Sequence, residues 1–246
     1  MTTSAEPVSL SAKDIHLAFG PNAVLRGVDH DVPADTTAAV IGPSGSGKST
    51  LLRTLNRLYE PDKGDILLDG RSVLADNPDH LRQRIGMVFQ NFNLFPHRSV
   101  LDNVTMAPRK LKPLSAEQAR ELGRSNWTGS GCGTRPMCGP PRCPAGSSSG
   151  WRSRGRWAMS PQVMFFDEAT SALDPELVKG ILSLIADLGS GGMTMVVVTH
   201  EMGFASSTSD AVVFMDHGQV VESGPPQQIF EAAETERLRR FLSQVL

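Results

Sequence analysis

The chain has 246 residues, 39% of them hydrophobic, and a formal net charge of −2 at pH 7. That length suits one large domain, or a core that carries a smaller subdomain, and the small negative charge gives no support for binding to nucleic acid. No apolar run approaches the roughly 20 residues of a membrane span, and the first residues lack the basic and then apolar layout of a secretion signal. We therefore expect any role at a membrane to depend on partner proteins.

The strands expected along the chain fall into two groups. The first 35 residues are typical of short strands and turns, which predicts a small antiparallel flank. Five short apolar runs then follow, and none of them alternates with polar residues. Uninterrupted runs of this length are typical of strands buried on both faces of a parallel sheet. They cover residues 38–42, 85–89, 163–167, 194–200 and 211–216.

Helical patterns lie between these runs, and the alternation of strand and helix predicts an α/β fold. One leucine stripe and one longer apolar stripe each mark a helix face. Ser115 and Gln118 form a capping box that opens a helix to about Leu122, and the tail from Pro225 is typical of one or two amphipathic helices. The two stripes are Leu51, Leu52, Leu55 and Leu58, and, after Pro175, Leu177, Ile181, Leu184, Ile185 and Leu188.

The stretch GPSGSGKST follows the first apolar run and opens the leucine-striped helix. Its glycines let backbone N–H groups surround phosphate oxygens, and the helix N-terminus adds partial positive charge. Lys48 would reach the β- and γ-phosphates, and the Ser49 hydroxyl would bind Mg²⁺. A glycine-rich connector is the alternative, but the complete pattern between strand and helix favours a nucleotide site. Its residues are Gly42, Pro43, Ser44, Gly45, Ser46, Gly47, Lys48, Ser49 and Thr50.

A second motif, VMFFDEATSALDP, places two acids at the end of an apolar run. Asp167 would stand at the carboxyl edge of the sheet, where open α/β sheets bind ligands, and would hold Mg²⁺ partly through water. Glu168 is then placed to polarise an attacking water as a general base. An acidic helix cap is the alternative, and it is less favoured beside a complete phosphate loop.

Two further polar residues end apolar runs, and spacing alone leaves their roles open. His200 is the last residue of the run 194–200, and it could contact the γ-phosphate or be structural. Gln90 follows the run 85–89 and could sense Mg²⁺ or water, or it could simply terminate a strand.

Taken together, four segments resemble the Walker A, Q-loop, Walker B with D-loop, and H-loop motifs of ABC transporter ATPase subunits. They are GPSGSGKST, MVFQNFNLFPH with Gln90, FFDEATSALDP and VVVTHEM, and their order and spacing match over nearly the whole chain. The segment FNLFPHRSVLDNVTMAP, residues 92–108, resembles the polar amino-acid uptake group in particular. The resemblance implies one ATPase domain with a RecA-like P-loop core, a β flank and a helical subdomain. The core would take about 1–90 and 160–246, and the helical subdomain 91–159.

The same resemblance implies the site roles. Phe19 would stack on adenine, against the alternative of a core aromatic. Glu168 would be the hydrolytic residue, with His200 and Gln90 sensing the γ-phosphate and the water. Ser49, Gln90 and Asp167 would hold Mg²⁺ beside ATP.

The resemblance also implies partners and a location. The chain would work as a homodimer, with residues 171–175 crossing the interface. Residues 90–110 would dock integral membrane permease subunits at the cytoplasmic face of the cell membrane. A substrate-binding protein would take part only indirectly, and nucleic acid not at all. ATP hydrolysis would then energise uptake of polar amino acids.

One motif of that family is missing. Where the family carries Leu-Ser-Gly-Gly-Gln, this chain reads RCPAGSSSGW, inside a tract of unusual composition. Residues 126–157 contain every Cys and Trp of the chain, together with seven glycines, five arginines and no acid. The cysteine spacing supports neither a zinc site nor a disulfide framework. Such a tract cannot offset its ordering entropy, so we expect it to be poorly packed.

A shifted reading frame accounts for this tract. Codons can be chosen for residues 142–157 so that reading from the last base of the first codon returns Leu-Ser-Gly-Gly-Gln-Gln-Gln-Arg-Val-Ala-Ile-Ala-Arg-Ala-Leu. We infer two compensating frameshifts, near codons 125 and 157, in the gene or in its recorded sequence. A natural flexible linker and an insertion with its own role are the alternatives, but neither explains why the spacing between motifs is preserved.

Three functions therefore compete at this stage. The first is the ATP-hydrolysing subunit of an importer, and the second is an ATP-binding module that hydrolyses little because the signature is missing. The third is a soluble ABC protein of repair or translation. It is least favoured because the chain has neither tandem cassettes nor a long coiled-coil insertion.

Overall fold

A computed structural model describes residues 6–90, 95, 97–112, 114–115, 117–121, 159–171 and 173–246. The tract at 126–157, with the frameshift and the poor packing inferred for it, lies outside the described residues, and those predictions stay predictions. Within the described ranges, we find no helix with the length and apolar character needed to cross a bilayer.

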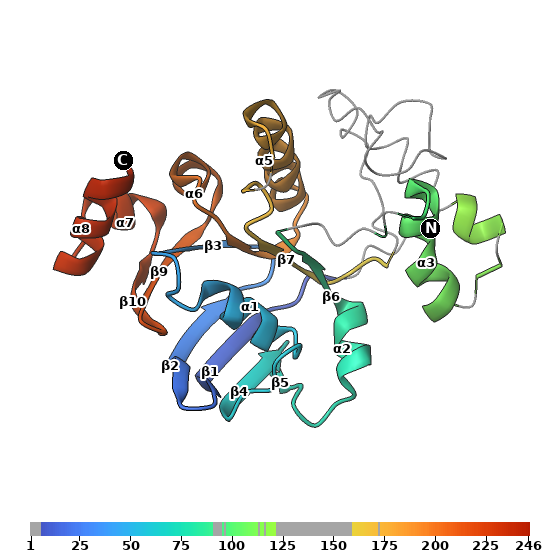
Figure 1. Cartoon of the computed structure of the whole chain (residues 1–246), viewed down its shortest axis with the longest axis horizontal. Coiled ribbons are helices and arrows are strands. Elements are labelled where there is room, and N and C mark those ends of the chain that lie inside the picture. Colours follow the sequence, from blue (N-terminus) through green and yellow to red (C-terminus); the bar gives the residue numbers. More distant parts are fainter. Residues whose placement is uncertain are drawn as a thin grey trace.

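A six-stranded sheet runs through the centre of the molecule (Figure 1) in the order β10-β9-β3-β8-β7-β6. Each predicted apolar run forms one of its parallel strands, which confirms the parallel sheet. The last strand was not anticipated: β10 pairs antiparallel with β9 because a tight turn at residues 217–218 reverses the chain. The strands are β3 (Thr37–Ile41), β6 (Ile85–Val88), β7 (Val163–Asp167), β8 (Thr194–Val198), β9 (Ala211–Asp216) and β10 (Gln219–Gly224).

A second, antiparallel sheet has the order β2-β1-β4-β5. It confirms the predicted flank but extends beyond the first 35 residues, because β1 also pairs with a strand that follows the first helix. Its strands are β1 (Leu10–Phe19), β2 (Asn22–Val32), β4 (Lys63–Leu68) and β5 (Arg71–Ser72).

Helix α1 (Lys48–Leu55) lies between the two sheets (Figure 1). Leu51, Leu52 and Leu55 are buried in the main core, which joins both sheets. The fourth leucine of the predicted stripe is a correction: Leu58 is 41% exposed. The helix ends before it, since Asn56 is the C-cap and Arg57 adopts a left-handed backbone, φ 50°.

Helices α5 (Pro175–Ser190) and α6 (Met202–Thr208) cover the opposite face of the six-stranded sheet (Figure 1). Successive residues of β7 serve the two faces, as strand geometry requires: Phe165 joins the core around α1, whereas Met164 and Phe166 pack with Ile185 of α5. These strands of the central sheet are therefore buried on both sides, which explains why the parallel strands carry uninterrupted apolar runs.

The C-terminal tail, expected to form one or two amphipathic helices, forms two: α7 (Pro226–Glu231) and α8 (Glu236–Val245). Leu238, Phe241 and Leu242 of α8 pack into a cluster with strand residues Val212 and Phe214. This cluster covers the β9 side of the sheet.

At the β6 side, α2 (Pro78–Arg84) leads into β6, and α3 (Val100–Leu111) lies farther out (Figure 1). The predicted capping box is confirmed: Gln118 N donates to Ser115 Oγ (3.1 Å), and Ser115 N donates to Gln118 Oε1 (2.8 Å).

Candidate functional site

The carboxyl ends of four adjacent parallel strands bring most of the predicted site residues to one edge of the central sheet. Gly42 follows β3, His200 comes two residues after β8, Asp167 ends β7, and Gln90 lies two residues beyond β6. Strands β3, β8, β7 and β6 are neighbours in that order. The edge is where open α/β sheets bind ligands, so residues far apart in sequence share one site. Gln90 is exposed in a turn at the end of this row.

The phosphate loop depends on glycine at two close approaches. Gly42 has φ 147°, and an added Cβ would lie 2.1 Å from the Met215 carbonyl oxygen. Gly47, the N-cap of α1, has φ 102°. Between them Ser46 N donates to Pro43 O (3.2 Å), which closes a tight turn. The loop thus delivers the chain directly into a helix N-terminus, whose free N–H groups favour anions.

A turn between β9 and β10 holds the phosphate loop from the side. Gly218 N donates to Ser46 O (3.0 Å), and Gly218 O accepts from Arg26 N (2.9 Å). With φ 79°, Gly218 has no room for a side chain, since a Cβ would lie 2.1 Å from Val24 O. Sequence reasoning missed this residue. The Asp-His-Gly turn after the apolar run 211–216 was the available signal, but nothing in it points to the loop.

The ammonium of Lys48 lies over its own loop. Its Nζ donates to Gly42 O and Pro43 O, both at 2.9 Å, and the side chain is buried. Burial lowers the pKa of Lys48, against the opposing effect of Glu168 and Asp167, which raise it. A buried ammonium that is paired only with neutral carbonyl oxygens favours the binding of an anion, which would balance its charge.

Asp167 is 1% exposed, and its two oxygens differ. Oδ2 accepts from Arg53 Nη2 at 3.1 Å, whereas Oδ1 is buried without a hydrogen-bond partner among the described residues. Ser49 stands half-buried in the first turn of α1. Over the same described ranges no three His, Cys, Asp or Glu side chains cluster to hold a metal. One orphan carboxylate oxygen, a hydroxyl and a phosphate loop fit Mg²⁺, which uses few carboxylates together with phosphate oxygens.

Glu168 and His200 meet at adjacent strand ends. Glu168 Oε1 lies 3.0 Å from His200 Nε2, and Glu168 N donates to Val198 O of β8 (3.0 Å). Glu168 adopts a left-handed backbone with φ 50°, which is uncommon for a residue with a Cβ. Such strain persists where surrounding contacts hold it, and here it turns the carboxylate toward the neighbouring strand.

Phe19 lies apart from the sheet edge, at the end of β1. It is 47% exposed and meets Tyr59 in an edge-on contact, with ring centroids 5.2 Å apart and planes at 82°. The alternative of a buried core aromatic therefore does not hold, whereas an exposed ring suits the predicted stacking. Tyr59 was missed because it lies in an irregular segment after α1.

Comparisons with known proteins agree on one family. The family model described as ABC transporter matches residues 25–171. The chain is 39% identical to the general L-amino acid transport ATP-binding protein AapP of Rhizobium johnstonii, over 100% of this chain and 96% of the relative. It is 40% identical to the arginine transport ATP-binding protein ArtM of Bacillus subtilis (96% and 100%) and 40% identical to the glutamine transport ATP-binding protein GlnQ of Escherichia coli (95% and 98%).

Solved structures give the same result for the fold. The dimeric post-hydrolysis ATP-binding cassette MJ0796, bound to ADP and Pi, matches with a TM-score of 0.72 and 26% identity over 88% of this chain and 98% of its own. CbiO1 from Clostridium perfringens matches with a TM-score of 0.75 and 26% identity over 96% and 94%. The ABC cassette fold, with its mixed sheet and antiparallel β subdomain, is therefore the fold of this chain. By sequence and by structure, the chain belongs to the ABC transporter family as one of its ATP-binding subunits.

Proposed function

We propose that the chain is the ATP-hydrolysing subunit of an importer that takes up polar amino acids. The observation that carries this proposal is the meeting of a phosphate loop, a buried Asp167 and the Glu168–His200 pair at one sheet edge. Relatives named for the transport of general L-amino acids, arginine and glutamine match over nearly their full length, and this supports the substrate class. We also propose a single domain, with a core of about 1–90 and 160–246 and a helical subdomain at 91–159.

In this proposal each residue at the edge has a separate task. Residues 42–50 surround the phosphates, and Lys48 exchanges its loop carbonyls for phosphate oxygens. Ser49, Asp167 and Gln90 would hold Mg²⁺, which would neutralise charge at the phosphates. Phe19 stacks on adenine with its exposed face.

Glu168 accepts a proton from the attacking water, and His200 orients that carboxylate through the 3.0 Å contact. General-base assistance of this kind requires a carboxylate within one hydrogen bond of the water. Gln90, which lies two residues beyond β6 in the same row of strands, would sense the γ-phosphate or the water.

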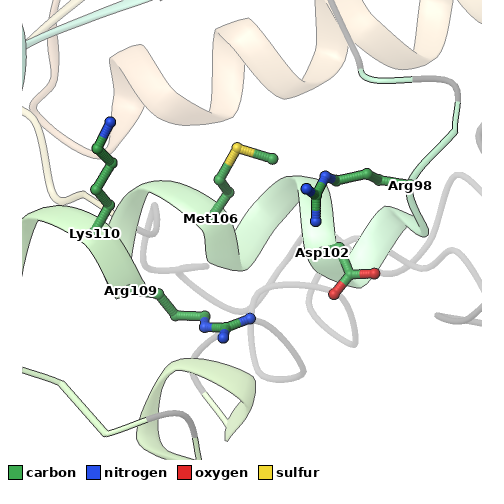
Figure 2. A pocket seen from close by; sticks show the side chains of 5 residues that line it. All are labelled: Arg98, Asp102, Met106, Arg109 and Lys110. Atoms are coloured by element: carbon green, nitrogen blue, oxygen red, sulfur yellow. The ribbon is translucent and has the colours of Figure 1, made fainter.

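Partners follow from the same proposal. Two copies of the chain would hold ATP between them beneath two permease subunits at the cytoplasmic face of the membrane, and a substrate-binding protein would act only through the permeases. The region 90–110 would dock the permeases. There α3 carries a surface pocket of about 300 Å³, shown in Figure 2, which is lined by Arg98, Asp102, Met106, Arg109 and Lys110.

Uptake measurements test the substrate class. Cells that depend on this chain should accumulate labelled arginine, glutamine or glutamate, and the Glu168→Gln variant should not support that uptake. The variant should still bind ATP, which separates a failed hydrolytic step from a missing protein. Unchanged uptake of all polar amino acids without the chain would contradict the importer proposal.

A second candidate is an ATP-binding module that hydrolyses little ATP. The supporting observation is that residues 142–147 read RCPAGS in place of Leu-Ser-Gly-Gly-Gln. ATPase activity should be compared between the chain as written and a version in which residues 143–157 are replaced by Leu-Ser-Gly-Gly-Gln-Gln-Gln-Arg-Val-Ala-Ile-Ala-Arg-Ala-Leu. Activity only in the replaced version supports the second candidate for the written chain. Nucleotide sequencing of codons 120–160 decides which chain the gene encodes.

A further inference from the structure

We propose that Arg53 is a positioning residue for the metal site: its guanidinium holds Oδ2 of Asp167 and leaves Oδ1 for Mg²⁺. The inference rests on the proposed function, because it takes Mg²⁺ to bind beside nucleotide at Asp167. Arg53 stands in the last turn of α1, and its Nη2 donates to Asp167 Oδ2 at 3.1 Å. The orphan Oδ1 of the same carboxylate is the atom that the pairing leaves available.

The helix places Arg53 and Ser49 together. These residues are four positions apart in α1, so their side chains leave the same helix face, and α1 contacts both β7 and β8. Ser49 opens the helix beside the phosphate loop, and Arg53 reaches the end of β7 one turn later. One face of α1 thus presents the Ser49 hydroxyl for the metal and the Arg53 guanidinium for the Asp167 carboxylate.

Asp167 requires such a cation. A carboxylate that is 1% exposed is costly to bury without a charged or hydrogen-bonding partner. Lys48 acts on Asp167 through charge alone and makes no hydrogen bond to it, since its Nζ donates to Gly42 O and Pro43 O. The Arg53 side chain is 36% exposed, so it spans from solvent to the buried carboxylate.

Arg53 is held from two sides: its guanidinium pairs with Asp167, and its carbonyl oxygen accepts from Tyr59 N at 3.2 Å. The same Tyr59 contacts the ring of Phe19. A row of contacts therefore links Phe19, the proposed adenine-stacking residue, to Asp167 through Tyr59 and Arg53.

Removing Arg53 should weaken Mg²⁺ binding. A ligating carboxylate depends on the partner that fixes its free oxygen, and loss of such a partner costs about 10–100-fold in metal affinity. Arg53→Ala should therefore raise the Mg²⁺ concentration at half-saturation by about 10-fold or more. Arg53→Lys keeps the charge but replaces the planar guanidinium fork with a single ammonium group, and should recover part of the loss.

The probe is ADP, whose affinity is measured in EDTA and across a Mg²⁺ titration. Arg53→Ala should leave the Mg²⁺-free affinity unchanged, because residues 42–50 are intact, and should shift only the Mg²⁺ titration. If Arg53→Ala does not fold, the Arg53→Lys titration against wild type carries the test. A half-saturation that stays the same, or falls because a competing cation has gone, would overturn the proposal.

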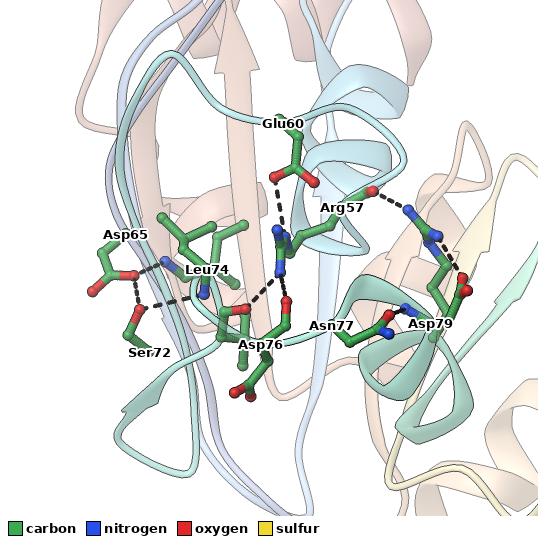
Figure 3. Close-up of polar contacts among 11 residues, drawn as sticks. Arg57, Glu60, Asp65, Ser72, Leu74, Asp76, Asn77 and Asp79 are labelled. Atoms are coloured by element: carbon green, nitrogen blue, oxygen red, sulfur yellow. Dashed lines mark hydrogen bonds and ion pairs between the residues drawn. The ribbon is translucent and has the colours of Figure 1, made fainter.

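Arg82→Ala is the matched control. Arg82 Nη1 pairs with Asp79 (3.0 Å), and Arg82 Nη2 donates to the Arg57 carbonyl oxygen, within the network of Figure 3, where Arg57 also donates to Glu60 and to two carbonyl groups. This variant removes an arginine side chain of similar exposure, 33% against 36% for Arg53, from an ion pair whose acid is exposed rather than buried. Its melting temperature should fall while its Mg²⁺ titration stays that of wild type. An equal shift in Arg82→Ala would mean that general loosening, not Asp167, is responsible.

The controls also separate the two proposals. If wild-type ADP binding shows no Mg²⁺ dependence, both the metal assignment at Asp167 and the role of Arg53 fail. If wild type depends on Mg²⁺ and Arg53→Ala follows the same titration, only the role of Arg53 fails.

Discussion

His200 Nε2 lies 3.0 Å from Glu168 Oε1, so the two residues form one pair across adjacent strand ends. From sequence they had separate tasks, one as a γ-phosphate sensor and the other as a base. Their contact supports the proposal that the histidine orients the carboxylate. When two residues act as a unit in catalysis, mutating both slows the reaction little more than mutating one of them.

Glu168→Gln should slow ATP hydrolysis and leave ATP binding intact, because the amide keeps the shape but cannot accept a proton. General-base assistance is worth about 10²–10⁴-fold, and the loss should fall in that range. Single-turnover hydrolysis and ATP titration should be measured in the version with the signature segment replaced. Wild-type turnover in this variant would remove the assignment.

His200→Ala should also slow hydrolysis, and it should add little to Glu168→Gln. If the histidine acts through the carboxylate, the double variant is no slower than the slower single variant. The same single-turnover assay on all four proteins closes the cycle. Multiplicative losses would show that His200 contacts the phosphate independently of Glu168.

Most of the fold, and the meeting of most proposed site residues at one sheet edge, could be predicted from sequence, because uninterrupted apolar runs and the phosphate-loop pattern are local signals. The parallel strands then brought Asp167, Glu168 and His200 to the same edge. Arg53 could not be assigned this way: its partner lies 114 positions away in the chain, and nothing beside it indicates a pairing.

The sequence analysis was wrong about one residue, Leu58, and missed one strand, β10, and both cases have a physical reason. Leu58 continued the leucine spacing of α1, but the left-handed backbone of Arg57 ends the helix first. β10 was missed because its burial is partial, so it lacks the apolar run that marks the strands inside the sheet.

Lys48→Ala should abolish tight ATP binding. The β- and γ-phosphates lose the cation that now lies on Gly42 O and Pro43 O, and backbone N–H groups alone do not balance that charge. The melting temperature without nucleotide should not fall, because the substitution removes a buried charge whose pKa is lowered by burial. ATP titration by calorimetry checks the first result, and unchanged affinity would contradict the site.

Gly218→Ala should weaken nucleotide binding although Gly218 is outside the loop. Its new Cβ would lie 2.1 Å from Val24 O, so the turn that contains residue 218 must shift away from Val24. That shift should break the hydrogen bond from Gly218 N to Ser46 O. Gly70→Ala is the control, because Gly70 has a similar φ of 72° but no atom within 4 Å of an added Cβ. Both variants carry backbone strain of about 1–2 kcal/mol. Only Gly218→Ala should lower ADP affinity, and equal affinities in the two variants would show that the turn does not hold the loop.

Glu222 provides the prediction for pH. The side chain is 8% exposed and accepts from Glu234 N (2.9 Å), Thr235 N (2.9 Å) and Thr235 Oγ1 (2.8 Å). It thereby fixes the entry to α8. Burial raises the pKa of Glu222, but these hydrogen bonds and Arg239 outweigh it, and the pKa is lowered. A carboxyl with a lower pKa in the folded state stabilises the fold above its unfolded pKa, and this contribution is lost as pH falls through the folded pKa.

Glu222→Gln should therefore destabilise the chain at pH 7 and matter less in acid. Hydrogen bonds to a charged group contribute about 1.5–3 kcal/mol, so the free energy of unfolding should fall by about 2 kcal/mol at pH 7. The gap between wild type and variant should narrow as the pH is lowered below the unfolded glutamate pKa of about 4.3, because protonation removes the same charge from wild type. Urea unfolding across this pH range measures the free energies of unfolding of wild type and variant. Glu231→Gln, at an exposed position of α7, is the control and should match wild type at every pH. A gap that stays constant with pH would show that packing, rather than the carboxylate charge, holds the entry to α8.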